Sequence, residues 1–269
     1  MTSALSAALP MLRCPYCRAP LTEDGATVRC TAGHAFDLAR QGYLNLLSGG
    51  SRAGTADTVE MVAARAAFLA AGHYRLLAEA LARAARGGPL LDVGGGTGWY
   101  ATRLLDAAPG TVGVTLDLSV PASRRAARAH PRLAAVVADA WQPWPVADAA
   151  FDTVLSVFAP RAPAETLRVL SHGGVLVVAT PTPRHLAELV RDLGLVTVDP
   201  DKPERLAAQL SAFSAVGTEL VEHELQLSVD GVAAVVGMGP SAHHATQPAT
   251  GPRRVTLSVQ VTTYAPRSR

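Results

Sequence analysis

The sequence predicts an α/β fold, in which a doubly wound parallel sheet follows a small cysteine-containing domain at the N-terminus. Three observations lead to this prediction. An apolar strand runs into a glycine-rich turn at Asp92–Gly98, and two further apolar strands are followed by Asp117 and Asp139. All 3 cysteines lie within the first 30 residues. We therefore expect two domains, residues 1–50 and residues 51–269.

The turn after the first strand carries glycine at every second position, Gly94, Gly96 and Gly98. Glycine lets the backbone bend tightly and approach a ligand where a Cβ atom would clash. A dinucleotide-binding loop of the G-x-G-x-x-G type would need glycine at position 99, where this chain has Trp99. The pattern present, D-x-G-x-G-x-G, resembles motif I of the class I S-adenosylmethionine methyltransferases. The alternative is a tight strand-to-helix turn that binds nothing.

The next two strands are also associated with aspartates. Thr111–Asp117 is expected to be a strand, and an acid at its end can accept hydrogen bonds from both hydroxyls of an adenosine ribose. Ala134–Ala138 is expected to be the third strand. It is followed by Asp139 and Ala140, at the position where class I methyltransferases hold the adenine. Three acid-tipped strands in succession favour a site for S-adenosylmethionine over an empty turn.

The composition describes a folded chain with little net charge. Its 269 residues include 24 lysines and arginines and 22 aspartates and glutamates, so the net charge is 24 − 22 = +2. So small a charge creates no global field that would draw the protein onto nucleic acid. Lys202 is the only lysine, so arginine is used throughout the sequence and is not by itself evidence of a phosphate ligand.

The hydropathy pattern gives no sign of a membrane partner. No apolar run reaches the roughly 18 residues that a membrane-spanning helix needs. Met1–Pro10 lacks the basic start and the apolar core of a signal peptide. We therefore expect a cytoplasmic protein. The sequence leaves the oligomeric state open, including a homodimer.

The cysteines form the second strong pattern. Cys14 and Cys17 make a C-x-x-C pair, and Cys30 is followed by His34. In a reducing cytosol three thiols form a poor disulfide set, but with one imidazole they complete a tetrahedral zinc shell. Four protein ligands leave no open position for catalysis, so we expect a zinc ribbon that holds one structural zinc ion. The alternative is three unrelated buried thiols.

Between the ribbon and the glycine-rich turn, the sequence predicts a linker and two helices. Asp57 and Glu60 resemble a capping box, with Asp57 as the N-cap residue of the first helix. This helix is expected to end at Gly72. The second helix is expected to start around Tyr74 and to run to about Arg86.

The second half of the chain supplies the remaining strands. Apolar runs at Phe151–Val157 and Val175–Thr180 predict the fourth and fifth strands. Glu219–Val229 and Val255–Tyr264 alternate apolar and polar residues, which suits an antiparallel closing pair. Between them, Gly237–Pro252 is a loop rich in glycine and proline. It either lines an acceptor pocket or is a mobile connection.

Taken together, these motifs resemble those of the 23S rRNA guanine-N1-methyltransferases. The resemblance rests on the cysteine and histidine set, the glycine-rich turn, Phe36–Leu47, Asp57-x-x-Glu60-Met61 and Gly72-His73-Tyr74. Three segments resemble most closely the actinobacterial branch associated with resistance to tylosin and related macrolides. These segments are Gly94–Gly98, Val157–Arg161 and Met238–Ser241.

The resemblance implies contacts with the methyl donor at Tyr74, at Gly96-Thr97 and at His185. The alternatives are that Tyr74 is an aromatic residue packed at a helix start and that His185 is a cap residue. Together with the residues argued above, the expected donor-binding set is Tyr74, Asp92, Gly94, Gly96, Thr97, Gly98, Asp117, Asp139, Ala140 and His185.

The resemblance also implies the reaction and the partner. We expect methyl transfer to N1 of a guanine in a hairpin loop of 23S rRNA, guanine 748 or alternatively guanine 745. No side chain is singled out as the general base that removes the N1 proton, so we assign no catalytic residue. A small-molecule methyltransferase and an RNA-binding adaptor without catalysis are the rival classes. Ser123–Arg128 either contacts RNA phosphates or forms a solvated helix face.

Overall fold

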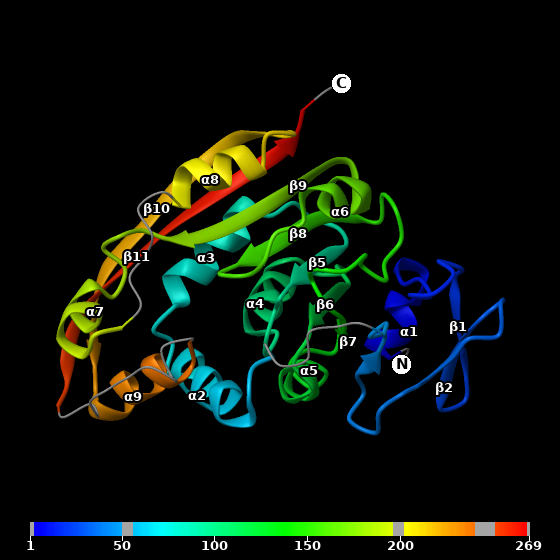
Figure 1. The fold of residues 1–269 in the computed structure, drawn as a ribbon, viewed down its shortest axis with the longest axis horizontal. Coiled ribbons are helices and arrows are strands. Elements are labelled where there is room, and N and C mark those ends of the chain that lie inside the picture. The colour runs from blue at the N-terminus through cyan, green and yellow to red at the C-terminus, as the bar shows by residue number, and fades with distance from the viewer. Residues whose placement is uncertain (1–2, 50–55, 196–201, 240–250, 268–269) are drawn as a thin grey trace.

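The computed structural model describes residues 3–49, 56–195, 202–239 and 251–267. These residues form a three-stranded sheet, β1-β2-β3, and an eight-stranded sheet in the order β10-β11-β9-β8-β5-β6-β7-β4. Figure 1 shows the three-stranded sheet at one end of the molecule, with α7 and α9 at the opposite end. The part of Gly237–Pro252 that carries His243 and His244 lies outside the described residues.

Parallel strands form the centre of the large sheet, with β5 paired to β6 on one side and to β8 on the other. The chain therefore reverses its winding direction at β5, and the glycine-rich turn follows this strand. Such a switch point leaves a crevice at the carboxyl ends of the strands. The five parallel central strands are β5 (Leu90–Val93), β6 (Gly113–Asp117), β7 (Leu133–Val137), β8 (Phe151–Val157) and β9 (Leu170–Pro181).

The antiparallel closing pair is confirmed, although both strands are longer than predicted. β10 (Phe213–Leu227) pairs with β11 (Arg253–Pro266), and β11 pairs with β9. A helix that the sequence did not predict, α9 (Val229–Gly237), follows β10 directly. Its N-cap is Ser228, whose Oγ accepts a hydrogen bond from the Gly231 N–H at 3.1 Å.

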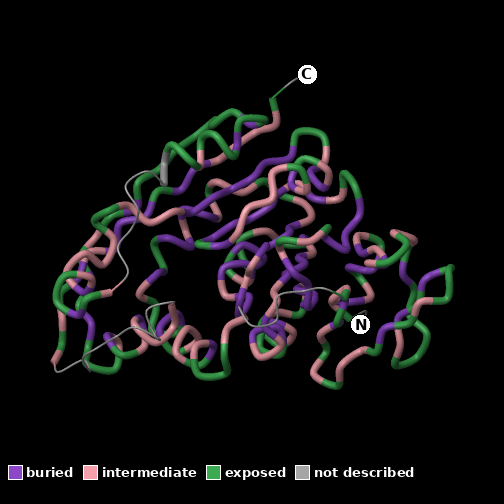
Figure 2. The backbone as a smooth tube through the Cα atoms, viewed as in Figure 1, coloured by how far each residue is buried: buried purple, intermediate pink, exposed green. Residues whose placement is uncertain are grey.

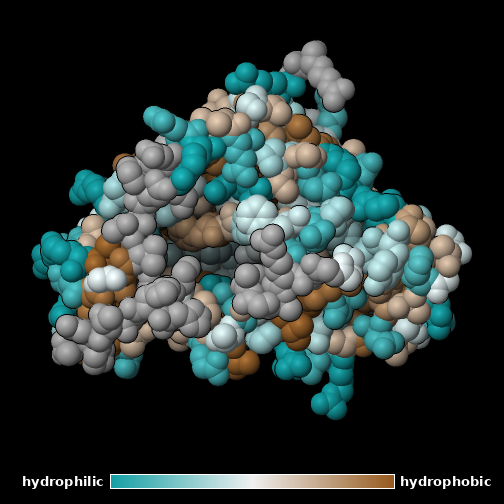
Figure 3. Space-filling model, viewed as in Figure 1, coloured by the Kyte–Doolittle hydropathy of each residue, from teal (hydrophilic) through white to brown (hydrophobic). Residues whose placement is uncertain are grey.

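The remaining helices flank the sheet or the ribbon (Figure 1). On the face in Figure 3, hydrophilic and apolar side chains are interspersed. No helix in the described ranges is long and apolar enough to cross a bilayer. The helices are α1 (Ala4–Ala8), a 3₁₀ turn at Leu9–Met11, α2 (Val59–Ala70), α3 (Arg75–Ala84), α4 (Trp99–Ala107), α5 (Val120–Ala126), α6 (Pro163–Val169), α7 (Ala187–Leu193) and α8 (Lys202–Gln209).

The prediction of Asp57 as the N-cap residue of α2 is wrong. The N-cap is Thr58, whose Oγ1 accepts a hydrogen bond from the Met61 N–H at 3.3 Å. The Asp57 carboxylate instead forms an ion pair with Arg65, two turns into the helix. Aspartate and threonine are both favourable N-cap residues. Because the Asp57 carboxylate is paired with Arg65, the Thr58 hydroxyl caps the helix instead.

The ribbon packs directly against the large sheet. Its strands are β1 (Leu21–Asp24), β2 (Thr27–Cys30) and β3 (Ala35–Asp37), and the next segment, β4 (Leu44–Asn45), pairs in parallel with β7. The Arg18 guanidinium donates hydrogen bonds to the carbonyl oxygens of Trp144 and Val146, at 2.5 and 2.7 Å.

The apolar core of the ribbon continues into the core of the sheet. Leu12, Val28 and Phe36 belong to the same buried cluster as Val136 and Trp144. Figure 2 shows buried residues concentrated in the central strands, with buried positions in the ribbon as well. Since this apolar surface is removed from water only when the two parts meet, their association stabilises both.

The helix after the glycine-rich turn packs closely because Gly98 has no side chain. Gly98 has φ 74° and is the N-cap residue of α4. A Cβ atom at this position would lie 2.7 Å from Cδ2 of Leu133 and 3.3 Å from Cβ of Ala126. The third glycine of the turn therefore serves helix packing as well as backbone conformation.

We predict that Gly98→Ala lowers the free energy of unfolding by about 2–5 kcal/mol. The left-handed backbone costs about 1–2 kcal/mol, and the collisions with Leu133 and Ala126 add about 1–3 kcal/mol. Gly110→Ala is the matched control, because Gly110 has φ 83° and nothing within 4 Å of the added Cβ atom. Urea unfolding measures both variants, and equal losses would contradict the packing argument.

Candidate functional site

The ribbon brings the four predicted metal ligands together. The ligand atoms of Cys14, Cys17, Cys30 and His34 all lie within 4.8 Å of one another. Sγ of Cys17 is 3.6 Å from Sγ of Cys30, and Nδ1 of His34 is 3.3 Å from Sγ of Cys30 and 3.5 Å from Sγ of Cys14. Zinc bonds of about 2.3 Å to sulfur and about 2.0–2.1 Å to nitrogen give tetrahedral ligand separations of about 3.6–3.8 Å. The residues therefore fit one tetrahedral zinc ion.

Backbone turns hold the two ligand pairs in place. The Arg18 N–H donates to the Cys14 carbonyl oxygen at 2.9 Å, which closes the turn that carries Cys17. The Gly33 N–H donates to the Cys30 carbonyl oxygen at 3.0 Å, and Gly33 has φ 88°. A side chain would strain that backbone, so glycine at position 33 suits the tight turn before His34.

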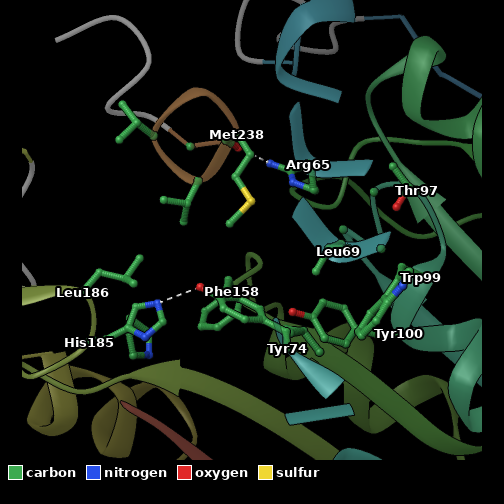
Figure 4. Close-up of a pocket in the computed structure, with 18 of the residues that line it drawn as sticks. Arg65, Leu69, Tyr74, Thr97, Trp99, Tyr100, Phe158, His185, Leu186 and Met238 are labelled. Atoms are coloured by element: carbon green, nitrogen blue, oxygen red, sulfur yellow. Dashed lines mark hydrogen bonds between the residues drawn. The ribbon is translucent and has the colours of Figure 1, made fainter. Parts of the chain in front are cut away.

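A second site is a cavity of about 340 Å³ at the carboxyl ends of β5, β8 and β9 (Figure 4). Small-molecule sites commonly measure about 300–1,000 Å³. Elements on both sides of the cavity contribute to its lining, among them α2 and α9. Six of the ten residues expected to bind the donor line it, namely Tyr74, Asp92, Gly94, Gly96, Thr97 and His185.

The other four expected residues do not line this cavity. Asp117 lies behind the glycine-rich turn, where its Oδ2 accepts a hydrogen bond from the Gly96 N–H at 2.8 Å. Gly98 is buried against Leu133 of β7 and Ala126 of α5. Asp139 and Ala140 follow β7, and Oδ1 of Asp139 accepts a hydrogen bond from the Trp141 N–H at 2.9 Å.

Asp92 is a buried carboxylate with an unsatisfied oxygen. It is 1% exposed, and its Oδ2 has no hydrogen-bond partner among the described residues. Burial, together with the charge of Asp117, raises the pKa of Asp92 to about 7. A Cβ atom at Gly95 would lie 2.5 Å from Oδ2 of Asp92, so the turn closes tightly over this carboxylate. A cationic group brought into the cavity would stabilise its ionised form.

Aromatic rings form one wall of the cavity. Figure 4 shows His185, Phe158, Tyr74, Tyr100 and Trp99 in a row. The Phe158 and His185 rings stack with centroids 5.8 Å apart. Phe158 is 42% exposed and has φ 54°, an uncommon backbone conformation for an aromatic residue. The loop after β8 thus presents an exposed ring at the cavity.

Tyr74 and His185 are joined by a hydrogen bond. The Tyr74 hydroxyl oxygen lies 3.2 Å from Nε2 of His185, and the Ser258 N–H donates to Nδ1 of His185 at 3.3 Å. Because Nδ1 accepts a hydrogen bond, a neutral ring carries its proton on Nε2 and donates it to Tyr74. Burial raises the pKa of Tyr74 well above its ordinary value, so its hydroxyl stays protonated at neutral pH.

Sequence reasoning missed several lining residues from α2 and α9, notably Arg65, Leu69 and Val235. Leu69 and Val235 have the apolar character of ordinary core residues. Arg65 could not be told apart from the other arginines, because arginine is abundant throughout the chain. The available signal was its place in the middle of a helix whose other residues, apart from Glu60 in the first turn, are apolar.

We predict that Cys17→Ser abolishes stoichiometric zinc binding, because a hydroxyl replaces one of the four ligands. Asp24→Asn, which changes an acid in the same ribbon outside the ligand cluster, should retain one zinc ion per chain. Metal analysis of the purified proteins measures the result. The zinc-free variant should also unfold more readily, since ribbon and sheet share a core. One zinc ion per chain in Cys17→Ser would contradict the ligand assignment.

The raised pKa of Asp92 predicts a specific pH dependence of stability. The folded protein holds this proton up to about pH 7, whereas the ordinary pKa of an aspartate side chain is 3.8. Stability therefore falls as pH rises between these values. Asp92→Asn removes this loss, so the variant should gain stability relative to the parent by up to about 4 kcal/mol over that range.

Urea unfolding without donor at about pH 5 and pH 8 measures this difference, with Asp106→Asn on α4 as the exposed control. The control should show no such gain, because the side chain of Asp106 is 55% exposed. A stability difference between Asp92→Asn and the parent that does not vary with pH would contradict the assignment.

Comparison with known proteins matches both parts of the chain. The family model described as "RlmA, N-terminal", a zinc ribbon, matches residues 12–49. The model described as "Methyltransferase domain" matches residues 90–174. A chain of the complex between the Haloferax volcanii Trm112 methyltransferase activator and a methyltransferase has a TM-score of 0.53. At 18% identity, with 79% of this chain and 99% of that chain covered, it shows the fold alone.

Two relatives are similar over most of their length. The 23S rRNA (guanine(748)-N(1))-methyltransferase of Streptomyces fradiae is 51% identical over 241 residues, which cover 87% of this chain and 86% of that protein. A protein of Micromonospora griseorubida named as a 23S rRNA (guanine-N(1)-)-methyltransferase is 46% identical, with 96% of this chain and 98% of that protein covered. The chain is therefore an S-adenosylmethionine-dependent methyltransferase and belongs to the 23S rRNA guanine-N1-methyltransferase family.

Proposed function

We propose that this enzyme methylates N1 of guanine 748 in a hairpin loop of 23S rRNA. The observation that carries the choice of guanine is the 51% identity to the Streptomyces fradiae enzyme, whose name specifies that nucleotide. Guanine 745 is the alternative acceptor. We further propose that the enzyme acts in the cytoplasm and that the modification contributes to resistance to tylosin and related macrolides.

The proposed donor site combines the cavity with the neighbouring strand ends. The Asp117 carboxylate would accept hydrogen bonds from the ribose hydroxyls, and Asp139 and Ala140 would hold the adenine. The backbone of Gly94–Thr97 and the side chain of Asp92 would face the amino-acid part. The unsatisfied Oδ2 of Asp92 supports a cationic ligand here. S-adenosylmethionine supplies an electrophilic methyl group attached to a sulfonium.

The aromatic wall supports a base as the acceptor. RNA bases that leave their stack are commonly recognised by stacking on aromatic side chains. Phe158 presents a partly exposed ring that stacks on His185. A hydrogen bond from His185 to Tyr74 holds the His185 ring in position. Phe158 would hold the guanine in line with the methyl group, while Tyr74 and His185 keep their expected contacts with the donor. Orientation of this kind lowers the barrier to transfer.

Four exposed arginines support an RNA partner. None of them forms an ion pair or a side-chain hydrogen bond with another of the described residues. Arg124, Arg125 and Arg128 lie on or just after α5, and Arg40 lies in a turn of the N-terminal segment. A Cβ atom at Gly42 would lie 3.8 Å from Cβ of Ala127, so that turn packs against the end of α5. Unpaired cations on adjoining segments suit a phosphate backbone.

The RNA-binding role of these arginines predicts a change in salt dependence. Arg40→Gln/Arg124→Gln/Arg128→Gln should weaken binding of the rRNA hairpin. It should also reduce the slope of log affinity against log salt by about 0.7–0.9 for each lost phosphate contact. The matched control is Arg75→Gln/Arg191→Gln/Arg254→Gln, which removes three exposed arginines that are paired with acids.

Fluorescence titration of a labelled hairpin at several salt concentrations measures both slopes. The control variant should keep the slope of the parent. Equal slopes for all three proteins would exclude these arginines from the RNA interface.

Primer extension tests the proposed reaction directly. A methyl group on guanine N1 blocks Watson–Crick pairing, so reverse transcriptase should stop one nucleotide before the modified base. Incubation of unmodified 23S rRNA with the enzyme and S-adenosylmethionine should create a new stop at guanine 748. A stop at guanine 745 would reassign the nucleotide. No donor-dependent stop on the rRNA would overturn the proposed function.

A further inference from the structure

We propose that Arg65 binds the carboxylate of the amino-acid group of the methyl donor. This contact goes beyond the residues that the sequence pointed to, none of which offers a permanent positive charge to that carboxylate. The proposal rests on the proposed placement of S-adenosylmethionine in the cavity of about 340 Å³.

The charges of the cavity match those of an amino-acid group. Among the described residues that line it, Arg65 is the one arginine or lysine and Asp92 is the one acid. The donor carries a carboxylate and an ammonium group at its amino-acid end. Charges withdrawn from water require partners of opposite sign. Arg65 would pair with the carboxylate. Asp92, whose Oδ2 has no partner among the described residues, would pair with the ammonium group.

The position of Arg65 places its charge beside the glycine-rich turn. A Cβ atom at Gly96 would lie 3.3 Å from Nη1 of Arg65 and 3.7 Å from its Cδ. The guanidinium therefore lies in close contact with the backbone of the turn at position 96. Figure 4 shows Arg65 between Met238 and Thr97 at the edge of the cavity. The side chain is 26% exposed, so water screens its charge only in part.

Two contacts fix the guanidinium and leave donors available. Arg65 forms an ion pair with Asp57, which precedes α2. Its Nη2 donates a hydrogen bond of 2.8 Å to the carbonyl oxygen of Met238, which follows α9. A guanidinium has five N–H donors in a rigid plane, and two such donors can bind a carboxylate together. The remaining N–H groups can therefore receive the donor while Asp57 and Met238 hold the group in position.

The alternative role for Arg65 is a purely structural link between α2 and α9. In that case the loss of Arg65 would weaken every ligand of the cavity by the same factor. A carboxylate contact instead weakens only those ligands that carry the carboxylate. The two roles are distinguished by the ratio of affinities for two ligands that differ in this group alone.

The test is calorimetry on the full chain with S-adenosylmethionine and with decarboxylated S-adenosylmethionine. The parent protein should prefer the carboxylated ligand by about 10- to 100-fold, as expected for charge-assisted hydrogen bonds. In Arg65→Gln the preference should fall to near unity, while the affinity for the decarboxylated ligand changes little. Arg103→Gln, on α4 with its guanidinium over the Trp99 ring, should keep the full preference.

Arg65→Met, which retains the apolar stem, serves as a second variant if Arg65→Gln does not fold. It should show the same loss of preference for the carboxylated ligand. A preference equal to that of the parent in the folded variant would overturn the role of Arg65. If the parent binds both ligands without preference, the carboxylate contact is likewise excluded. If the parent binds neither ligand, the proposed donor site itself fails.

Discussion

The Asp117 carboxylate is the group on which the geometry of the proposed donor site depends. Its Oδ2 accepts the Gly96 N–H and its Oδ1 accepts the Ser119 N–H, both at 2.8 Å. These bonds join the glycine-rich turn after β5 to the start of α5 through the last residue of β6. Burial raises the pKa of Asp117, and the two hydrogen bonds act in the opposite direction. The bonds therefore favour the ionised form that a ribose contact requires.

The same carboxylate affects the charge balance of the cavity. Its proximity adds to the effect of burial on Asp92, and its own ionisation is favoured by Arg65 and opposed by Asp57. The site thus gathers acids at the carboxyl ends of two neighbouring strands. Two neighbouring acids suit a sulfonium ligand, and a buried acid without a partner of its own costs stability. The raised pKa of Asp92 is a direct expression of that cost.

Much of this arrangement could be predicted from the sequence where one local pattern determines the structure. Phe151–Val157 is an apolar run because β8 is largely buried, and the predicted and observed bounds agree. The metal ligands could be predicted because zinc fixes their spacing. The choice between Asp57 and Thr58 as the N-cap could not, since it depends on an ion pair with Arg65.

Features that depend on distant contacts were beyond sequence reasoning. β4 has only two residues and exists because it pairs with β7. The short apolar run of α9 is equally consistent with a strand. Arg65 reaches the cavity only because the fold places α2 beside the glycine-rich turn, and Asp139 lies outside the cavity although its sequence position matches the motif.

The central claim is that the Asp117 carboxylate builds the donor site, and the affinity of Asp117→Ala for S-adenosylmethionine tests it most directly. Loss of charge-assisted hydrogen bonds should weaken binding by about 1.5–3 kcal/mol. Calorimetry on the zinc-loaded full chain measures this quantity, with Asp106→Asn as the control that should bind like the parent. An affinity of Asp117→Ala equal to that of the parent would contradict the account.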